Sequence, residues 1–175
     1  LVANFPMQGM PESARNLFKT RLETIVRDAK AKFAVNAART IEIVDAAGGA
    51  STALTTLDEP RREKSHRWPT FLPDGDHLLF VAQTGEAGAK EDASTIEALS
   101  MSTGARTRLV VANSSPVYAA GGHLLFWREG ALLAQRFDPP RLALSGDPVA
   151  VASPVAFTQN EQALASLSEE GTLVY

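Results

Sequence analysis

The sequence of 175 residues contains no cysteine, which excludes disulfide bonds and thiolate metal sites. It also has no apolar run near the roughly 20 residues that a membrane-spanning helix needs, so we expect no membrane insertion by this segment. The chain opens on Leu1, without the charged start and apolar core of a signal peptide. We therefore expect a processed piece or an excised fragment of a longer protein.

Clustered positive charge is lacking over most of the chain. Residues 1–40 carry seven Lys or Arg against three Asp or Glu, whereas residues 41–175 carry ten against seventeen. Phosphate binding requires clustered cations, so this mildly acidic body predicts no nucleic-acid partner. Apolar residues make up 45% and charged residues 21% of the chain, which indicates a folded globular protein rather than a disordered one.

Familiar catalytic motifs are missing as well. The segment Gly49–Ala53 lacks the second glycine of a Gly-x-Ser-x-Gly elbow. The segment Gly85–Asp92 contains a Gly-x-Lys pattern, but it lacks the Walker spacing and the hydroxyl residue after the lysine. We therefore expect no catalytic residue, no cofactor-binding residue and no cofactor.

The histidines and aspartates do not form a metal-binding pattern. His77 and His123 occupy equivalent positions at the starts of two expected strands, so they would lie apart rather than converge on one ion. His66 falls in an expected loop. Asp74 and Asp76 flank a glycine without the further oxygen ligands of a calcium loop, and an aspartate in such a turn more often accepts backbone hydrogen bonds. We expect no metal site.

One short pattern occurs three times along the chain. Its copies are LPDGDHLLF (Leu72–Phe80), YAAGGHLLF (Tyr118–Phe126) and LSEEGTLVY (Leu167–Tyr175). The last aromatic residues of successive copies lie 46 and 49 residues apart. In each copy glycine precedes an aliphatic and aromatic run, which is typical of a tight turn that leads into a buried strand.

A second hairpin precedes each copy, in residues 41–55, 95–110 and 131–151. One unit therefore holds four short strands in about 40–50 residues, which is typical of a β-propeller blade. A β-sandwich would also have many short strands, but not this fixed long period. The sequence predicts an all-β fold, a partial β-propeller of about three four-stranded blades. The approximate units are residues 41–94, 95–130 and 131–175.

The first 40 residues do not show the blade pattern. Apolar residues recur there at helical spacing after a Pro11-Glu12-Ser13 start. We expect an N-terminal amphipathic helix over about residues 11–33, with a basic polar face. A helix that covers an open face or edge of the blades is favoured over one that lies on a membrane surface.

The segment HRWPTFLPDGDHLLF resembles the Trp-Pro-x-Phe-x-Pro-Asp-Gly segment of TolB-like, WD-repeat-related propellers. The stretch from Val117 to Ala152, with SLSEEGTLVY after it, resembles the propeller that lies C-terminal to the kinase and membrane segments of many bacterial serine/threonine protein kinases. The resemblance covers about Ile41 to Tyr175. It implies a bacterial propeller with an extracytoplasmic location.

The resemblance supplies structural signature residues rather than an active site. They are Trp68, Pro69, Pro73, Asp74, Gly75, Phe80, Gly122, Phe126, Gly171 and Tyr175. We expect Trp68 to pack between blades or to shield its hairpin. Trp127 follows Phe126 in a strand and should face the opposite side. Trp127 is the one candidate binding residue, although a packing role is favoured for it.

The expected function rests on analogy of fold. We expect a non-catalytic propeller module that binds a protein or a small ligand, as a sensor or scaffold segment of a larger bacterial protein. The alternative is an accessory propeller of a prolyl-oligopeptidase-like hydrolase whose catalytic domain lies outside this chain. Because about three blades cannot close a ring of about four to eight, self-association through open blade edges is also expected.

Overall fold

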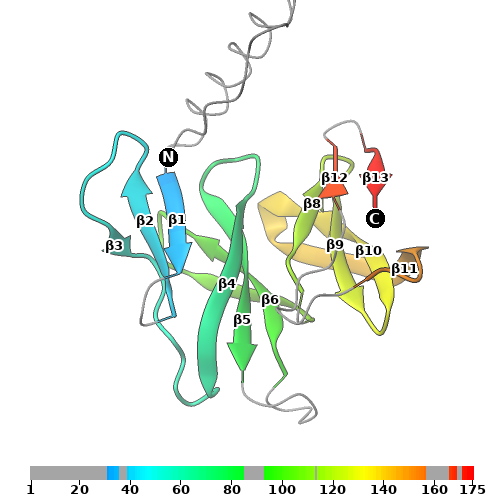
Figure 1. Cartoon of the computed structure of the whole chain (residues 1–175), viewed down its shortest axis with the longest axis horizontal. Helices are drawn as coiled ribbons and strands as arrows, with labels where there is room; N and C mark the ends of the chain where they lie inside the picture. The colour runs from blue at the N-terminus through cyan, green and yellow to red at the C-terminus, as the bar shows by residue number, and fades with distance from the viewer. Residues whose placement is uncertain (1–30, 36–38, 85–92, 113, 157–165, 169–170) are drawn as a thin grey trace, which may run out of the picture. The chain divides into compact units, whose positions relative to one another are not determined.

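The computed structural model describes residues 31–35, 39–84, 93–112, 114–156, 166–168 and 171–175 (Figure 1). The chain divides into two compact units, one of residues 1–33 and 43–52 and the other of residues 34–42 and 53–175. The second unit holds both four-stranded sheets. Every described element is a β-strand except the short 3₁₀ turn η2 (Pro139–Arg141), and no helix in this part of the chain is long and apolar enough to cross a membrane.

Three short strands form one sheet in the order β1-β2-β3. They are β1 (Ala31–Val35), β2 (Ile41–Asp45) and β3 (Thr52–Ala53). The predicted helix over about residues 11–33 is wrong for its last three residues, which belong to β1, and residues 11–30 lie outside the described part of the chain. Phenylalanine and valine, which both occur in this strand, favour extended backbone over helix.

The first four-stranded sheet is antiparallel, with the order β4-β5-β6-β7. Its strands are β4 (Glu63–Phe71), β5 (His77–Thr84), β6 (Thr95–Ser100) and β7 (Arg106–Val111). The run from Leu78 to Ala82 in β5 is fully buried. A strand that is covered on both faces needs such a continuous apolar run rather than alternation, and this explains the repeated Leu-Leu-Phe pattern.

The second four-stranded sheet has the same sequential order, β8-β9-β10-β11. Its strands are β8 (Val117–Ala119), β9 (His123–Arg128), β10 (Ala131–Asp138) and β11 (Ala143–Ala152). Gly122 has a φ of 78° in the turn before β9, a backbone conformation that glycine adopts without strain. The third copy of the repeat forms a two-stranded sheet of β12 (Ser166–Leu167) and β13 (Leu173–Val174).

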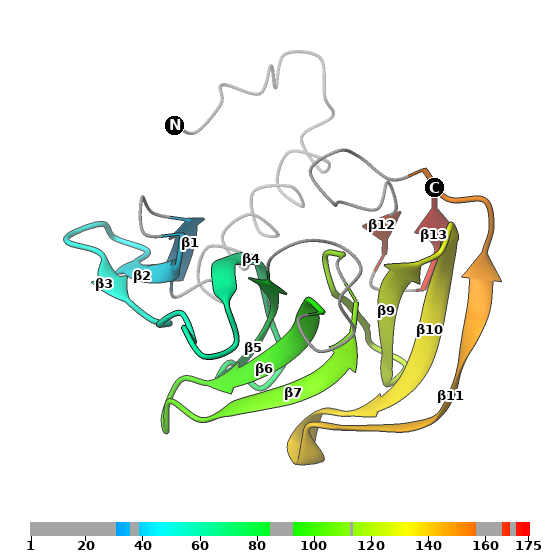
Figure 2. The ribbon, with the colours of Figure 1, turned by 90° about the horizontal axis from the view of Figure 1, so that it is seen from below.

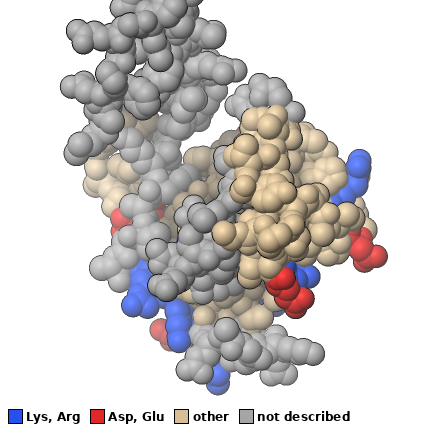
Figure 3. Space-filling model, turned by 45° about the vertical axis from the view of Figure 1, so that its right-hand side comes forward, with Lys and Arg blue, Asp and Glu red and all other residues tan. Residues whose placement is uncertain are grey.

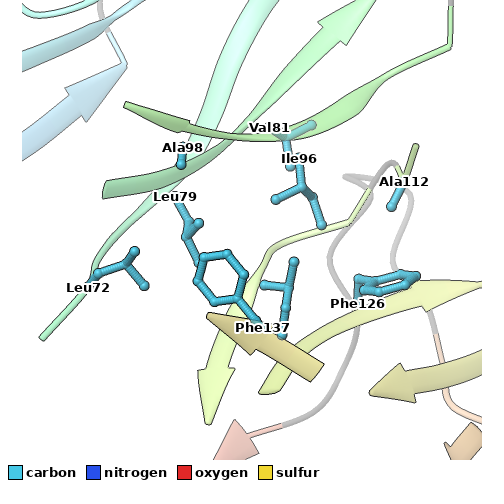
Figure 4. Packing of buried hydrophobic residues seen from close by; sticks show 9 residues of the cluster. Leu72, Leu79, Val81, Ile96, Ala98, Ala112, Phe126 and Phe137 are labelled. Atoms are coloured by element: carbon cyan, nitrogen blue, oxygen red, sulfur yellow. The ribbon is translucent and has the colours of Figure 1, made fainter. Parts of the chain in front are cut away.

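The two four-stranded sheets pack face to face through nine buried residues, the central cluster (Figures 2 and 4). These are Leu72, Leu79, Val81, Ile96, Ala98, Ala112, Leu124, Phe126 and Phe137. Phe137 lies at the end of β10, and its ring reaches towards Leu79 of the facing sheet (Figure 4). Each large apolar side chain buried in this way stabilises the fold by about 1.5–3 kcal/mol.

The other face of the β8–β11 sheet carries a smaller outer cluster of Leu125, Leu132, Ala152 and Val155. Successive side chains of β9 alternate, so Leu125 joins this cluster while Leu124 and Phe126 join the central cluster. Leu167 and Leu173 of the β12–β13 hairpin pack against it. The strands β5 and β9, which carry the first two copies of the repeat, therefore lie in two sheets that pack on each other.

The all-β partial propeller predicted from the repeat is the fold observed, but two details differ. The sheets run from Glu63 to Val111 and from Val117 to Ala152, so the predicted unit ends at 94 and 130 fall inside sheets. Similarity between copies sets the period of a repeat, but not the strand at which a sheet begins. The expectation that His66 lies in a loop is wrong: it is buried within β4. Pro69 lies in the same strand, where the register against β5 shifts. Because proline in a sequence argues against a regular strand, the pattern predicted a loop here.

Truncating Phe126 tests the importance of the central cluster. Phe126→Ala should lower the free energy of unfolding by about 3–5 kcal/mol, because it empties a large volume at the contact between two sheets. Urea denaturation followed by circular dichroism measures the loss. Val149→Ala, at a position 65% exposed on β11, is the matched control and should change stability little. Equal losses in the two variants would contradict the role of the cluster.

Candidate functional site

A groove of about 470 Å³ opens on the outer-cluster face of the β8–β11 sheet, beside the β12–β13 hairpin. Its lining residues come from the end of β8, from the turn between β8 and β9, from β9, β10 and β11, and from the hairpin. They are Ala119, Ala120, Gly121, His123, Leu125, Ala134, Val151, Leu167, Gly171 and Leu173. The groove therefore forms where the second and third copies of the repeat meet.

Small residues create the hollow. The Ala119–Gly122 turn presents no bulky side chain, and Ala134 stands opposite Leu125 in the β9–β10 register. In a close-packed interior such positions would be filled by neighbouring side chains. Here the larger residues Leu167 and Leu173 close one side, and the remaining space stays open.

The chemistry of the groove is apolar with one polar group. His123 is the only titratable residue that lines it, and its ring has no hydrogen-bond partner among the described residues. Uncharged residues form most of the described surface on the side that Figure 3 presents, with Asp, Glu, Lys and Arg side chains towards its margins. A surface of this kind suits an apolar side chain and one hydrogen-bond acceptor or donor.

Trp127 lies next to this groove but does not line it. Its indole packs against the outer cluster, and its Nε1–H donates to the carbonyl oxygen of Val155 at 3.2 Å. The backbone N–H of Trp127 donates to Ser114 Oγ at 2.8 Å. These contacts hold Trp127 in a packing position, and a ligand-binding role for it stays a prediction.

The signature turn of the first copy is built around Asp74. Its Oδ1 accepts the backbone N–H groups of Asp76 and His77, both at 2.9 Å, and its Oδ2 contacts His77 Nδ1 at 2.8 Å. Gly75 supplies a φ of 72°, and Pro73 is exposed. The expected role of Asp74 as a backbone hydrogen-bond acceptor is confirmed by these contacts.

The second part of the signature is a bulge in β4. The register of β4 against β5 shifts between Arg67 and Thr70, and Trp68 there has a φ of 52°. Trp68 packs against the central cluster between the two sheets, with the Arg67 guanidinium 5.9 Å from its ring centre. A bulge turns a side chain away from the regular alternation, so it directs Trp68 onto this interface.

The remaining signature residues separate into interior and surface positions. Phe80 and Phe126 are fully buried, whereas Tyr175 is 67% exposed. Gly122 and Gly171 both adopt positive φ in equivalent turns. Of the ten signature residues, Gly171 alone lines the groove.

A buried ionic cluster lies on the other face of the β4–β7 sheet, against Phe80. Glu63 and Glu97 are almost fully buried, and the guanidinium groups of Arg61 and Arg106 each contact both carboxylates at 2.7–2.8 Å. The Arg106 guanidinium also lies 5.3 Å from the Phe80 ring centre. Two carboxylates and two guanidinium groups balance in charge, which a buried site requires.

The electrostatics of this cluster follow from its contacts. Burial raises the pKa of Glu63, but hydrogen bonds from His66, Arg106 and the Asp58 backbone outweigh it and lower that pKa from 4.5 to about 2. Burial also raises the pKa of Glu97, and its Arg61 and Arg106 contacts bring it below the ordinary value. Both carboxylates are therefore ionised at neutral pH.

His66 extends the cluster into a chain of hydrogen bonds. Its Nε2 lies 2.9 Å from Glu63 Oε2, and its Nδ1 lies 2.8 Å from Thr55 Oγ1. Thr55 Oγ1 accepts the Ile41 backbone N–H at 2.9 Å, which leaves its own hydrogen for the imidazole. Every carboxylate and guanidinium group is occupied by a neighbour, so the cluster is suited to holding strands together rather than to catalysis.

The sequence patterns predicted neither the ionic cluster nor the groove. Glu97 stands in the buried run Thr-Ile-Glu-Ala-Leu-Ser, and a charged residue in such a strand was the signal for a buried ion pair. The groove has no single-residue signal, because it depends on the third copy packing beside the second. No group of three or more His, Cys, Asp or Glu in the described ranges is placed to hold a metal ion.

Comparison with known proteins identifies the fold. No family model matches the chain, and no curated protein matches it. The crystal structure of TolB from Acinetobacter baumannii is similar, with 20% sequence identity and a TM-score of 0.54. The match covers 82% of this chain and 34% of that one, so this chain spans about a third of the TolB length. The likeness shows a TolB-like propeller fold, and nothing in these comparisons supports the resemblance to kinase propellers.

Removing the Glu63 charge tests the ionic cluster. Glu63→Gln should lower the free energy of unfolding at pH 7 by about 3–5 kcal/mol, because it leaves two guanidinium groups with one carboxylate. The lowered pKa of Glu63 stabilises the native chain above about pH 4.5, and this contribution is lost as the pH falls towards about 2. Denaturant titrations between pH 7 and pH 2.5 would show a shallower pH dependence in the variant. Asp147→Asn, at an exposed position, should follow the unchanged protein, and the same profile in all three proteins would contradict the assignment.

Proposed function

We propose that this chain is a non-catalytic propeller segment of a larger bacterial protein, and that it binds polypeptide in the groove on the β8–β11 sheet. The observation that carries the proposal is the groove itself. It offers about 470 Å³ of mostly apolar space beside the outer cluster. Apolar hollows of this kind on a folded surface mark sites of association.

Polypeptide is favoured over a small ligand by what surrounds the groove. Exposed apolar residues continue from the groove along β11, where the lining residue Val151 is 48% exposed and Val149 is 65% exposed. Next to it, Val174 is 61% exposed on the short strand β13. Strand edges and a strip of exposed apolar side chains match an extended peptide, which supplies backbone hydrogen bonds and alternate side chains together.

The location and the assembly state belong to the same proposal. An extracytoplasmic location follows from the TolB-like resemblance of the sequence, and the absence of cysteine is compatible with it. When no polypeptide fills the groove, the same apolar surface supports self-association of the chain. Sedimentation at low micromolar concentration should therefore show association that decreases when a binding peptide is added, and a monomer that is unaffected by peptide would contradict this.

Peptide binding to the groove can be measured through Trp127. In a Trp68→Phe background Trp127 is the only tryptophan, and it packs against the outer cluster beside the groove. Octapeptides that alternate Leu or Val with Thr should change its emission saturably, with Kd of about 10–100 μM, while octapeptides of Ser and Lys should not.

Two variants locate the binding. Ala134→Arg places a long charged side chain in the groove and should abolish binding, and Ala134→Leu should weaken it by filling the space with an apolar group. Ala143→Arg is the matched control, because Ala143 is exposed on β11 outside the groove. Thermal melts establish that the variants fold. Binding that survives both Ala134 changes, or binding of indole without binding of any peptide, would overturn the proposed function.

A further inference from the structure

The two four-stranded sheets present equivalent residues on equivalent faces. In the β4–β7 sheet, two cross-strand pairs of β5 and β6 face the central cluster. In the β8–β11 sheet, the two corresponding pairs join β9 and β10, and the residues on β9 lie 46 positions after those on β5. These pairs face the outer cluster. The correspondence is Leu79 with Leu125, Val81 with Trp127, Ile96 with Leu132, and Ala98 with Ala134.

The strand before each of these hairpins continues the equivalence. Leu72 lies opposite His77, the first residue of β5, and its backbone N–H donates to the carbonyl oxygen of His77. Ala119 lies opposite His123, the first residue of β9, in the same way. Leu72 belongs to the central cluster, while Ala119 lines the groove. The groove face of the β8–β11 sheet is therefore the counterpart of the face through which the β4–β7 sheet receives its neighbour.

The β12–β13 hairpin is in turn the counterpart of β8–β9. Leu167 pairs with Leu173 as Tyr118 pairs with Leu124, 49 residues earlier. The turn before each second strand carries a glycine with positive φ, 78° at Gly122 and 87° at Gly171. The hairpin thus corresponds to the first two strands of a further blade, packed on the outer cluster as β8 and β9 pack on the central cluster.

At the inner interface, a third strand completes the packing. Phe137, near the end of β10, is 2% exposed, and its backbone N–H donates to the carbonyl oxygen of Gly122 at 2.9 Å. Its ring meets that of Tyr118 edge to face, with centres 6.2 Å apart. It lies in the central cluster with Leu72, Leu79 and Ala98, the receiving residues of the facing sheet (Figure 4).

The groove is lined by the counterparts of the residues that surround Phe137. These counterparts are Ala119 for Leu72, Leu125 for Leu79, Ala134 for Ala98, Leu167 for Tyr118, Gly171 for Gly122 and Leu173 for Leu124. Two of the replacements are by smaller residues, which gives the groove ample room for an aromatic ring. No described residue plays the part of Phe137 there.

We propose that the groove is the acceptor site for an aromatic side chain on a β-strand that pairs with β13, and that its occupant is the third strand of the blade that β12 and β13 begin. The backbone N–H of the aromatic residue donates to the carbonyl oxygen of Gly171, as Phe137 does to Gly122. A residue four positions earlier, the counterpart of Leu133, lies opposite Tyr175 and covers its exposed ring. This inference rests on the proposed function, because it names the polypeptide that the groove binds.

A peptide that copies β10 tests the inference on the chain as it exists. The octapeptide ALLAQRFD has the sequence of residues 131–138, with the phenylalanine in the seventh position. It should bind the Trp68→Phe protein at least about tenfold more tightly than the same peptide with Phe→Ala, because an aromatic anchor in a pocket dominates such contacts. A peptide with N-methyl-phenylalanine keeps the ring but loses the N–H donor, and it should also bind several-fold more weakly.

Amide hydrogen exchange tests strand pairing separately from affinity. Binding of ALLAQRFD should slow exchange at Leu173 and Tyr175, the counterparts of Leu124 and Phe126, because their N–H groups lie on the open edge of β13. The N-methyl peptide should protect them less. A peptide with the phenylalanine moved by one position should lose the gain in affinity, because a shift of one residue turns its ring to the opposite face of the strand. All of these changes are in the peptide, so none of them affects folding of the protein.

Each outcome decides the inference. Equal binding of the Phe, Ala and shifted peptides would overturn the aromatic acceptor site while leaving polypeptide binding by the groove intact. Binding of the Phe peptide without protection of Leu173 and Tyr175 would overturn strand pairing with β13. Failure of this peptide where the Leu/Val and Thr octapeptides bind would overturn the inference alone. Failure of every peptide would overturn the proposed function with it.

Discussion

The face-to-face packing of two four-stranded sheets is the interaction on which the rest of the structure depends. A single antiparallel sheet with apolar residues on both faces has no stable form in water, since each face must be covered. β5 and β9 carry apolar residues on both faces of their sheets, and the central cluster covers one of these faces in each sheet. Each sheet therefore creates a requirement for a neighbour on its second face, and the outer cluster with the β12–β13 hairpin shows how the β8–β11 sheet begins to meet it.

The two faces of the β4–β7 sheet meet this requirement in different ways. One face uses aliphatic and aromatic side chains in the central cluster, whereas the other places Glu63, Glu97, Arg61 and Arg106 around Phe80. Apolar contacts tolerate small displacements, but ion pairs with fixed geometry fix the register of the strands that carry them. Arg106 on β7 also donates to the carbonyl oxygen of Thr56, which ties the edge of the sheet to the segment before β4.

The repeat made the fold predictable and left the site mostly hidden. Copies that end in Phe80 and Phe126 specify strands that are buried on both faces, and a fixed period of four strands specifies blades. The bulge at Trp68 and the buried position of His66 were not visible, because proline in a strand reads as a loop. The groove was not visible either, since Ala119 and Ala134 are ordinary residues until the third copy is placed beside them.

The strand order of the two sheets has a consequence for how the chain folds. Every pair of neighbouring strands within each sheet is also adjacent in sequence, so each sheet can form one hairpin at a time with short loops to close. The contacts that join residues 36 and 43 positions apart, from Arg61 to Glu97 and from Glu63 to Arg106, form only after those hairpins exist. We therefore expect the ionic cluster to stabilise an arrangement that local strand pairing builds first.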